Sequence, residues 1–210
     1  MGHDAARMLL AFVVMPLWVA AGFLDWLCHR RTHIETTSGP KESWLHLLLF
    51  AELGVPLLAV LFFEVNALLF AMILAALAAH QITALRDLHH AVPRRVVSPF
   101  EQQVHSALEM MPVAALLLLG VLHWPQLLAL FGVGGEAPRY ELRLRNPPLS
   151  TGYVVGLLAC VCLFNALPFL EELLRGLRAV RTLPITAGTA GSTPSPAHDA
   201  TKRRQERVPH

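Results

Sequence analysis

Hydrophobic residues fall into five long runs along this chain, and polar residues gather in the segments between them. Runs of about 18 or more nearly uncharged residues have the length that a helix needs to cross a bilayer. We therefore expect membrane-spanning helices over residues 8–28, 42–63, 67–90, 101–121 and 150–174. Pro16 is a candidate for a kink in the first helix, and the fourth helix would extend to residue 131 if Pro112 and Pro125 only bend it.

The remaining segments are polar. Residues 132–149 read as a loop, in which the alternating residues 140–145 predict a short edge strand. From residue 182 the composition shifts to Gly, Ser, Thr, Pro and Ala, which predicts a disordered tail with basic residues. The expected organisation is an all-α integral membrane domain of five helices over residues 1–181, followed by a tail over residues 182–210.

Composition supports lipid as the surrounding solvent. The chain is 54% hydrophobic and 15% charged, whereas soluble domains carry about a quarter of charged residues. A formal net charge of +2 gives no indication of a nucleic-acid partner. The three cysteines form no Cys-x-x-Cys pair, and their odd number argues against a disulfide framework.

One motif occurs twice, each time at the start of an apolar run. Pro40, Glu42 and His46 repeat as Pro99, Glu101 and His105, and a serine precedes each proline by one or two residues. Serine favours the cap and proline the first turn of a helix, so the motif predicts two helix starts. Within each motif the Glu and the His are four residues apart and therefore share one helix face.

Basic residues predict the orientation. The ends joined by residues 29–41 and 91–100, together with the C-terminal segment, carry 13 of the Lys and Arg residues, against four on the opposite side. The positive-inside rule then places the N-terminus outside and the C-terminus in the cytoplasm. We expect a protein of the bacterial inner membrane.

Seven of the eleven histidines, with several acids, lie toward this cytoplasmic end of the first four helices. Most recur at spacings of three or four residues, which keeps each set on one stripe of its helix. We therefore expect these four helices to form a metal-binding bundle of two related hairpins. The predicted metal ligands are Asp25, His29, His33, Glu42, His46, Glu52, His80, Asp87, His90, Glu101, His105 and Glu109.

Glu52 and Glu109 are predicted to lie inside the hydrocarbon, where a charge costs at least about 2–3 kcal/mol. No Lys or Arg on a neighbouring stripe is expected to compensate the charge of these two acids, whereas two metal ions would. The predicted ligands outnumber those that two ions need, so some would hydrogen-bond to the ligands or bind a third ion. Residues outside the set have other expected roles. Cys28, His123, Glu171 and Glu172 read as structural, and Arg30, Arg31, Arg94 and Arg95 as a mouth that binds a headgroup or an acidic donor, or that only sets topology.

Mixed histidine and carboxylate ligands suit iron, manganese or zinc, and the many carboxylates favour two irons. His29-x-x-x-His33 after one membrane helix, and Asp87-Leu88-His89-His90 after another, resemble the membrane-embedded diiron enzymes, that is, the fatty acid desaturases, hydroxylases and alkane monooxygenases. The carboxylate content is closer to a ferritin-type bundle. This resemblance implies an oxidoreductase that activates oxygen on a lipidic or apolar substrate, with electrons from a cytosolic donor.

Two other functions fit the same residues. A zinc-dependent intramembrane hydrolase would use a metal-bound water and a carboxylate base. A metal carrier or channel is the third, but the helices of Glu52 and Glu109 become wholly apolar beyond those residues, which disfavours transport.

Overall fold

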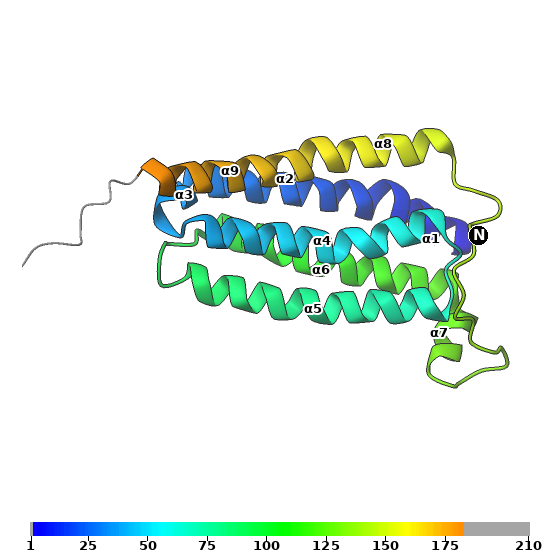
Figure 1. Ribbon diagram of the computed structural model, residues 1–210. Coiled ribbons are helices and arrows are strands. Elements are labelled where there is room, and N and C mark those ends of the chain that lie inside the picture. Colours follow the sequence, from blue (N-terminus) through cyan, green and yellow to red (C-terminus); the bar gives the residue numbers. More distant parts are fainter. Residues whose placement is uncertain (1, 183–210) are drawn as a thin grey trace, which may run out of the picture.

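The computed structural model describes residues 2–182, and its long helices run side by side along one axis (Figure 1). Five helical segments are long and apolar enough to cross a membrane, which confirms the predicted all-α membrane fold. Three are single helices, α4 (Pro40–Phe62), α5 (Ala67–Ala91) and α6 (Pro99–Leu122). The predicted tail lies outside the described residues, apart from Thr182.

The first and last spans each contain a π-helical segment. The first joins α1 (Gly2–Leu9), η1 (Leu10–Val14) and α2 (Met15–Arg31); the last joins α8 (Thr151–Val161), η2 (Cys162–Ala166) and α9 (Leu167–Thr182). Pro16 and Pro168 each follow a π segment within two residues. A proline lacks the N–H that an α-helix needs, and a wider turn before it is one way to accommodate that loss. The irregularity expected at Pro16 therefore takes the form of a π turn.

The helix ends explain the boundaries. At α6, the side chain of Ser98 accepts a hydrogen bond from the Glu101 amide at 3.2 Å, as the motif predicts. At α4, the cap is Gly39 with a φ of 75°, and Ser38 does not cap the helix. Pro112 stays inside α6, whereas the chain breaks at His123 and starts the short helix α7 (Trp124–Leu130). The fourth span thus ends at Leu122.

The predicted strand over residues 140–145 is wrong. Within residues 2–182 this segment forms only a single bridge, between Leu144 and Phe63. The turn between α4 and α5 is too short to offer a partner strand, so the loop is held by a few backbone hydrogen bonds, including Arg145 to Phe62 at 2.9 Å. This pairing lays the loop over one end of the bundle.

The fifth span is part of the bundle wall. Helix α4 packs along α5, and α2 packs along α6, while α9 contacts α4, α2 and the short helix α3 (Ile34–Thr37). Figure 1 shows α9 beside α3, at the end of the bundle where α2 ends and α4 begins. The opposite half is filled by apolar side chains, with Leu69, Phe70 and Leu119 at its centre.

Candidate metal centre

Seven of the twelve predicted ligands meet in the polar half of the bundle. They come from α2, α4, α5 and α6, so four separate spans contribute to one cluster. All except His105 are buried. The seven are Asp25, His29, Glu42, His46, Asp87, Glu101 and His105.

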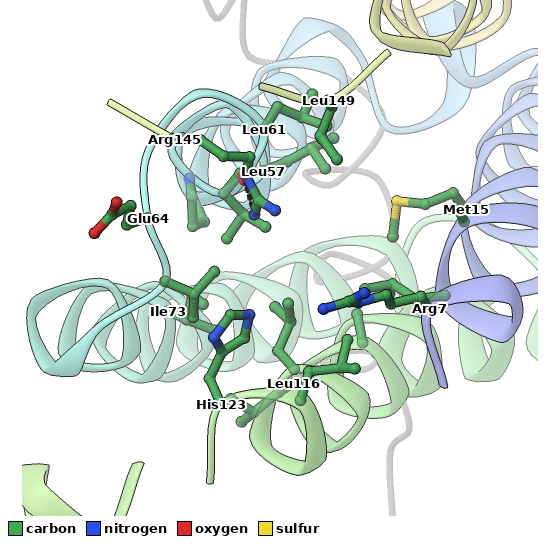
Figure 2. A pocket seen from close by; sticks show the side chains of 18 of the residues that line it. Arg7, Met15, Leu57, Leu61, Glu64, Ile73, Leu116, His123, Arg145 and Leu149 are labelled. Atoms are coloured by element: carbon green, nitrogen blue, oxygen red, sulfur yellow. Dashed lines mark hydrogen bonds between the residues drawn. The ribbon is translucent and has the colours of Figure 1, made fainter. Parts of the chain in front are cut away.

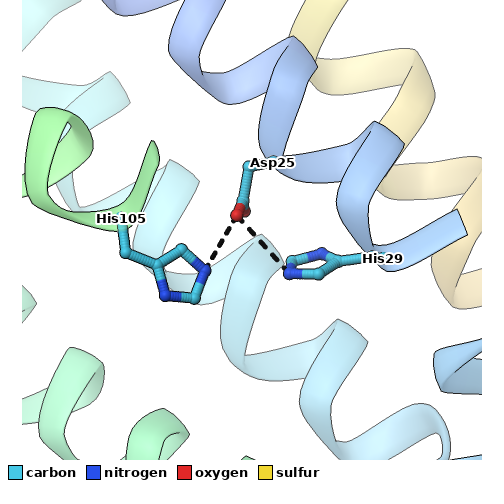
Figure 3. A group of neighbouring side chains, drawn as sticks. All are labelled: Asp25, His29 and His105. Carbon is cyan, nitrogen blue, oxygen red and sulfur yellow. Dashed lines mark ion pairs between the residues drawn. The ribbon is translucent and has the colours of Figure 1, made fainter. Parts of the chain in front are cut away.

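The first group of possible ligands joins α2 to α6 (Figure 3). Asp25 Oδ1 lies 2.8 Å from His105 Nε2 and 3.4 Å from His29 Nε2. Asp25 and His29 are one helical turn apart, which lets both side chains point toward the helix that carries His105. One nitrogen or oxygen atom from each residue lies within 4.8 Å of the others, close enough to share a metal ion.

The second group joins α2 to α4. His29, Glu42 and His46 again offer ligand atoms within 4.8 Å of one another. The rings of His29 and His46 stack, with centroids 4.2 Å apart and planes inclined by 8°. His46 Nε2 also lies 3.4 Å from Asp87 Oδ2, which brings α5 into the site. Since His29 belongs to both groups, the two potential metal positions are neighbours.

Glu172 of α9 completes the cluster, and its interpretation as a structural residue away from the site is wrong. It is 1% exposed, and its two carboxylate oxygens lie 3.1 Å from His29 Nδ1 and 2.8 Å from His46 Nδ1. An ionised carboxylate only accepts hydrogen bonds, so both Nδ1 atoms carry hydrogen. In its neutral form, each imidazole would then present a lone pair on Nε2, the form that binds a metal.

Arg95 is likewise inside the cluster and not at its mouth. Glu42 Oε1 accepts hydrogen bonds from Arg95 Nε at 2.9 Å and Nη2 at 2.6 Å, and Arg95 Nη1 lies 2.6 Å from Glu101 Oε1. Burial opposes the charge, but the hydrogen bonds and charge of Glu42, with the charge of Glu101, raise the pKa of Arg95 above its ordinary value. Arg95 therefore compensates part of the buried charge of Glu42 and Glu101.

The carboxylates of the cluster outnumber its one arginine. Asp25, Glu42, Asp87, Glu101 and Glu172 supply five buried carboxylates against the one guanidinium of Arg95. With neutral histidines, four negative charges remain, which equals the charge of two divalent cations. Burying that many charges of one sign is unfavourable, so bound cations would stabilise the cluster when its histidines are neutral.

Unpartnered atoms support the same conclusion. Buried polar atoms in folded proteins almost always have a hydrogen-bond partner, and exceptions call for an explanation. In the described chain, several buried atoms of this cluster have none, and they include Arg95 Nη1 and the two histidine nitrogens that Glu172 leaves free. The possible metal donors among them are His29 Nε2, His46 Nε2, Asp25 Oδ1, Asp87 Oδ1, Glu42 Oε2 and both carboxylate oxygens of Glu101. Two of these, Asp25 Oδ1 and Glu101 Oε1, lie at ion-pair distance from His105 and Arg95.

Two predicted ligands lie elsewhere at this end of the molecule. His33 follows the end of α2, has a left-handed backbone with a φ of 51°, and its side chain is 73% exposed beside Glu35. His90 is buried, but its Nε2 lies 3.1 Å from the backbone carbonyl of Ser38. The structure therefore does not bring either residue to the seven.

The other three form a separate, deeper set. Glu52 Oε1 accepts a hydrogen bond from Thr83 at 2.8 Å, and Glu52 Oε2 lies 3.9 Å from His80 Nδ1. Glu109 is largely exposed and lines the same cavity as His80. One acid and one histidine in contact are fewer ligands than the main cluster offers.

An apolar cavity of about 430 Å³ opens onto the cluster. Asp25, His46, Asp87 and His105 form its polar wall. Its remaining wall is mainly hydrophobic and includes Trp18, Leu49, Phe50, Leu53, Leu57 and Leu157. The site thus combines possible metal ligands with a space suited to an apolar molecule.

Comparison with protein-family models, with curated proteins and with solved structures finds no match to this chain.

Proposed function

We propose that this protein is a membrane-embedded dinuclear iron enzyme that uses oxygen to oxidise an apolar substrate. The observation that carries this proposal is the meeting of buried histidines and carboxylates from four helices at the wall of an apolar cavity. Ferritin-type di-iron bundles hold their metals with a similar mixture of about six carboxylates and histidines. The resemblance to membrane diiron enzymes noted in the sequence points in the same direction.

Each residue has a defined task in this proposal. His29, His46 and His105, with Asp25, Asp87, Glu42 and Glu101, would hold the metals, which when bound supply the oxygen chemistry. Glu172 fixes the tautomer and the orientation of two histidines. Arg95 orients Glu42 and Glu101 while leaving Glu42 Oε2 and Glu101 Oε2 without a hydrogen bond.

The cavity walls bind the substrate and limit water. Leu49, Leu53 and Leu57 present apolar surface from the same helix that carries His46, and they favour a hydrocarbon over a polar molecule. Because Asp25, His46, Asp87 and His105 line this space where it meets the cluster, an apolar substrate would be oriented with one segment against the metal centre.

The proposal includes a cytoplasmic donor of electrons. No flavin or iron–sulfur motif occurs in the sequence, so the electrons would come from a separate protein. Arg30 and Arg94 are exposed at the end of the bundle that carries the centre, where they suit an acidic partner. The excess of basic residues at that end supports a cytoplasmic location in a bacterial inner membrane.

Elemental analysis of the purified protein tests the proposal most directly. Two irons per chain, with consumption of oxygen when a reductant and an apolar substrate are added, is the expected result. Zinc as the only metal would overturn it in favour of an intramembrane hydrolase. Transport of metal ions is disfavoured by Arg7, Arg139 and Arg145, since these cations line the cavity at the opposite end of the bundle and would repel a metal ion.

A further inference from the structure

A second cavity, of about 600 Å³, lies at the end of the bundle opposite the metal centre. It is enclosed by the first span, α4, α5, α6 and the start of α8, with the 139–149 loop across its end. Most of its wall is hydrophobic, but three arginines line it, Arg7, Arg139 and Arg145. A cavity of this size is within the range that binds a small ligand.

Within the described residues, two of the arginines form no ion pair, although Glu64 lines the same cavity and its charge acts on Arg145. Arg139 lies 3.8 Å from Glu64, whereas neither Arg7 nor Arg145 forms an ion pair within the described part of the chain. Arg145 donates one hydrogen bond from Nη2 to the Val60 carbonyl at 3.0 Å, and its buried Nε has no partner there. Figure 2 shows the guanidinium groups of Arg7 and Arg145 directed toward the same space.

The positive charge of this cavity affects the pKa of His123. Burial, followed by the charges of Arg145, Arg7 and Arg139, lowers the pKa of His123 to about 4. The pKa of Arg145 is also lowered, first by burial and then by the neighbouring Arg7. Two guanidinium groups that repel each other beside an apolar wall would both be stabilised by an anion.

The apolar wall leads from these arginines toward the metal centre. Met15, Trp18, Leu53, Leu57 and Leu157 line both this cavity and the one beside the metal ligands. Arg7 and Asp25 are 18 residues apart on one continuous helical span, which places them about 27 Å apart along its axis. A distance of this order suits a long hydrocarbon chain.

We propose that this cavity binds a single-chain amphiphile, whose anionic headgroup lies between Arg7 and Arg145 and whose hydrocarbon chain runs along the shared wall toward the metal centre. The headgroup site is independent of the proposed function, and only the meeting of the chain with the metals rests on it. A free fatty acid or a similar amphiphile, with one anionic headgroup and one chain, matches the paired arginines at one end and the apolar wall that the two cavities share.

Binding of radiolabelled oleate to the purified full-length protein tests the headgroup site without requiring turnover. Oleate should bind about tenfold more tightly than oleyl alcohol, and R7Q and R145Q should each remove most of that difference without changing the affinity for the alcohol. R143Q is the matched control, because Arg143 lies in the same loop, is exposed and pairs with Glu141. Thermal unfolding of each variant verifies that it is folded.

Equal affinities for oleate and oleyl alcohol, or unchanged oleate affinity in folded R7Q and R145Q, would overturn the headgroup site. Inorganic phosphate that displaces oleate at equal concentration would also overturn the proposal, because it would show a site for small anions. Tight oleate binding to a protein without iron would refute the proposed function and leave the headgroup site standing.

A second pair of variants tests the path of the chain. L57W places a large side chain where the two cavities share a wall, and it should weaken oleate about tenfold while leaving the shorter octanoate unchanged. L58W is its control, since Leu58 is the next residue and is 45% exposed on the outside of the helix. An L57W protein that binds oleate as tightly as L58W would contradict the proposed path.

Discussion

His29 and His46 stack face to face at 4.2 Å, and both direct Nδ1 to the one carboxylate of Glu172. The two histidines come from α2 and α4, and Glu172 comes from α9. This arrangement fixes the same tautomer in both rings and holds their Nε2 atoms on the side of Asp25, Glu101 and Asp87. The two imidazoles therefore act as a preformed pair.

The first prediction concerns that carboxylate. E172Q can no longer accept hydrogen bonds from both Nδ1 atoms through carboxylate oxygens, so we expect metal affinity to fall about 10- to 100-fold. Metal content after dialysis against a chelator measures this change. E171Q is the matched control, because Glu171 is the adjacent acid and contacts Trp26, Arg30 and Arg175 away from the cluster. Equal metal retention in both variants would contradict the role given to Glu172.

A second pair of variants separates two histidines that are four residues apart. H29A removes the residue shared by both groups of ligands, and we expect it to lose most of the bound metal. H33A should keep the wild-type content, because the His33 side chain is largely exposed. Inductively coupled plasma mass spectrometry provides the measurement. Metal loss in H33A equal to that in H29A would place His33 in the site.

The third prediction distinguishes the main cluster from the deeper acid. His105 contacts Asp25 at 2.8 Å, so H105A should lose about one ion per chain. Glu52 contacts Thr83 and His80 instead, and E52A should retain both ions. If E52A loses as much metal as H105A, the deeper set holds an ion of its own.

The fourth prediction concerns stability. R95Q leaves Glu42 and Glu101 buried without their guanidinium partner, which should destabilise the fold by about 3–5 kcal/mol. Thermal unfolding in detergent would show a clearly lower midpoint. R94Q is the control, since Arg94 is exposed and its side chain donates to the His90 carbonyl. A midpoint for R95Q that matches R94Q would show that the buried acids are compensated in another way.

Hydropathy predicts the five spans because the length and the lack of charge of each run are properties of the sequence itself. The pairs Asp25 and His29, Glu42 and His46, and Glu101 and His105 could be recognised in the same way. Helical geometry places residues four apart on one face wherever the helix continues. His33 shows the limit of that rule, because α2 ends at Arg31 and the spacing no longer determines its direction.

Arg95 and Glu172 could not be placed from the sequence because both reach the cluster through tertiary packing. Arg95 lies in a polar loop next to the exposed Arg94, and nothing local distinguishes the two arginines. Glu172 offered a weak signal, as one of two adjacent acids near the end of an apolar span on the same side as the histidines. Only the packing of α9 against α2 and α4 shows which acid faces inward.

The position of Glu172 near the end of the chain has a consequence for biosynthesis. The seven gathered side chains are synthesised by residue 105, whereas the carboxylate that organises two of them follows more than sixty residues later. A nascent chain therefore exposes unorganised acids and imidazoles to the inserting membrane until its final span is in place. Truncated products that lack this span would assemble four helices around an unfinished polar interior, which marks them as substrates for membrane quality-control proteases.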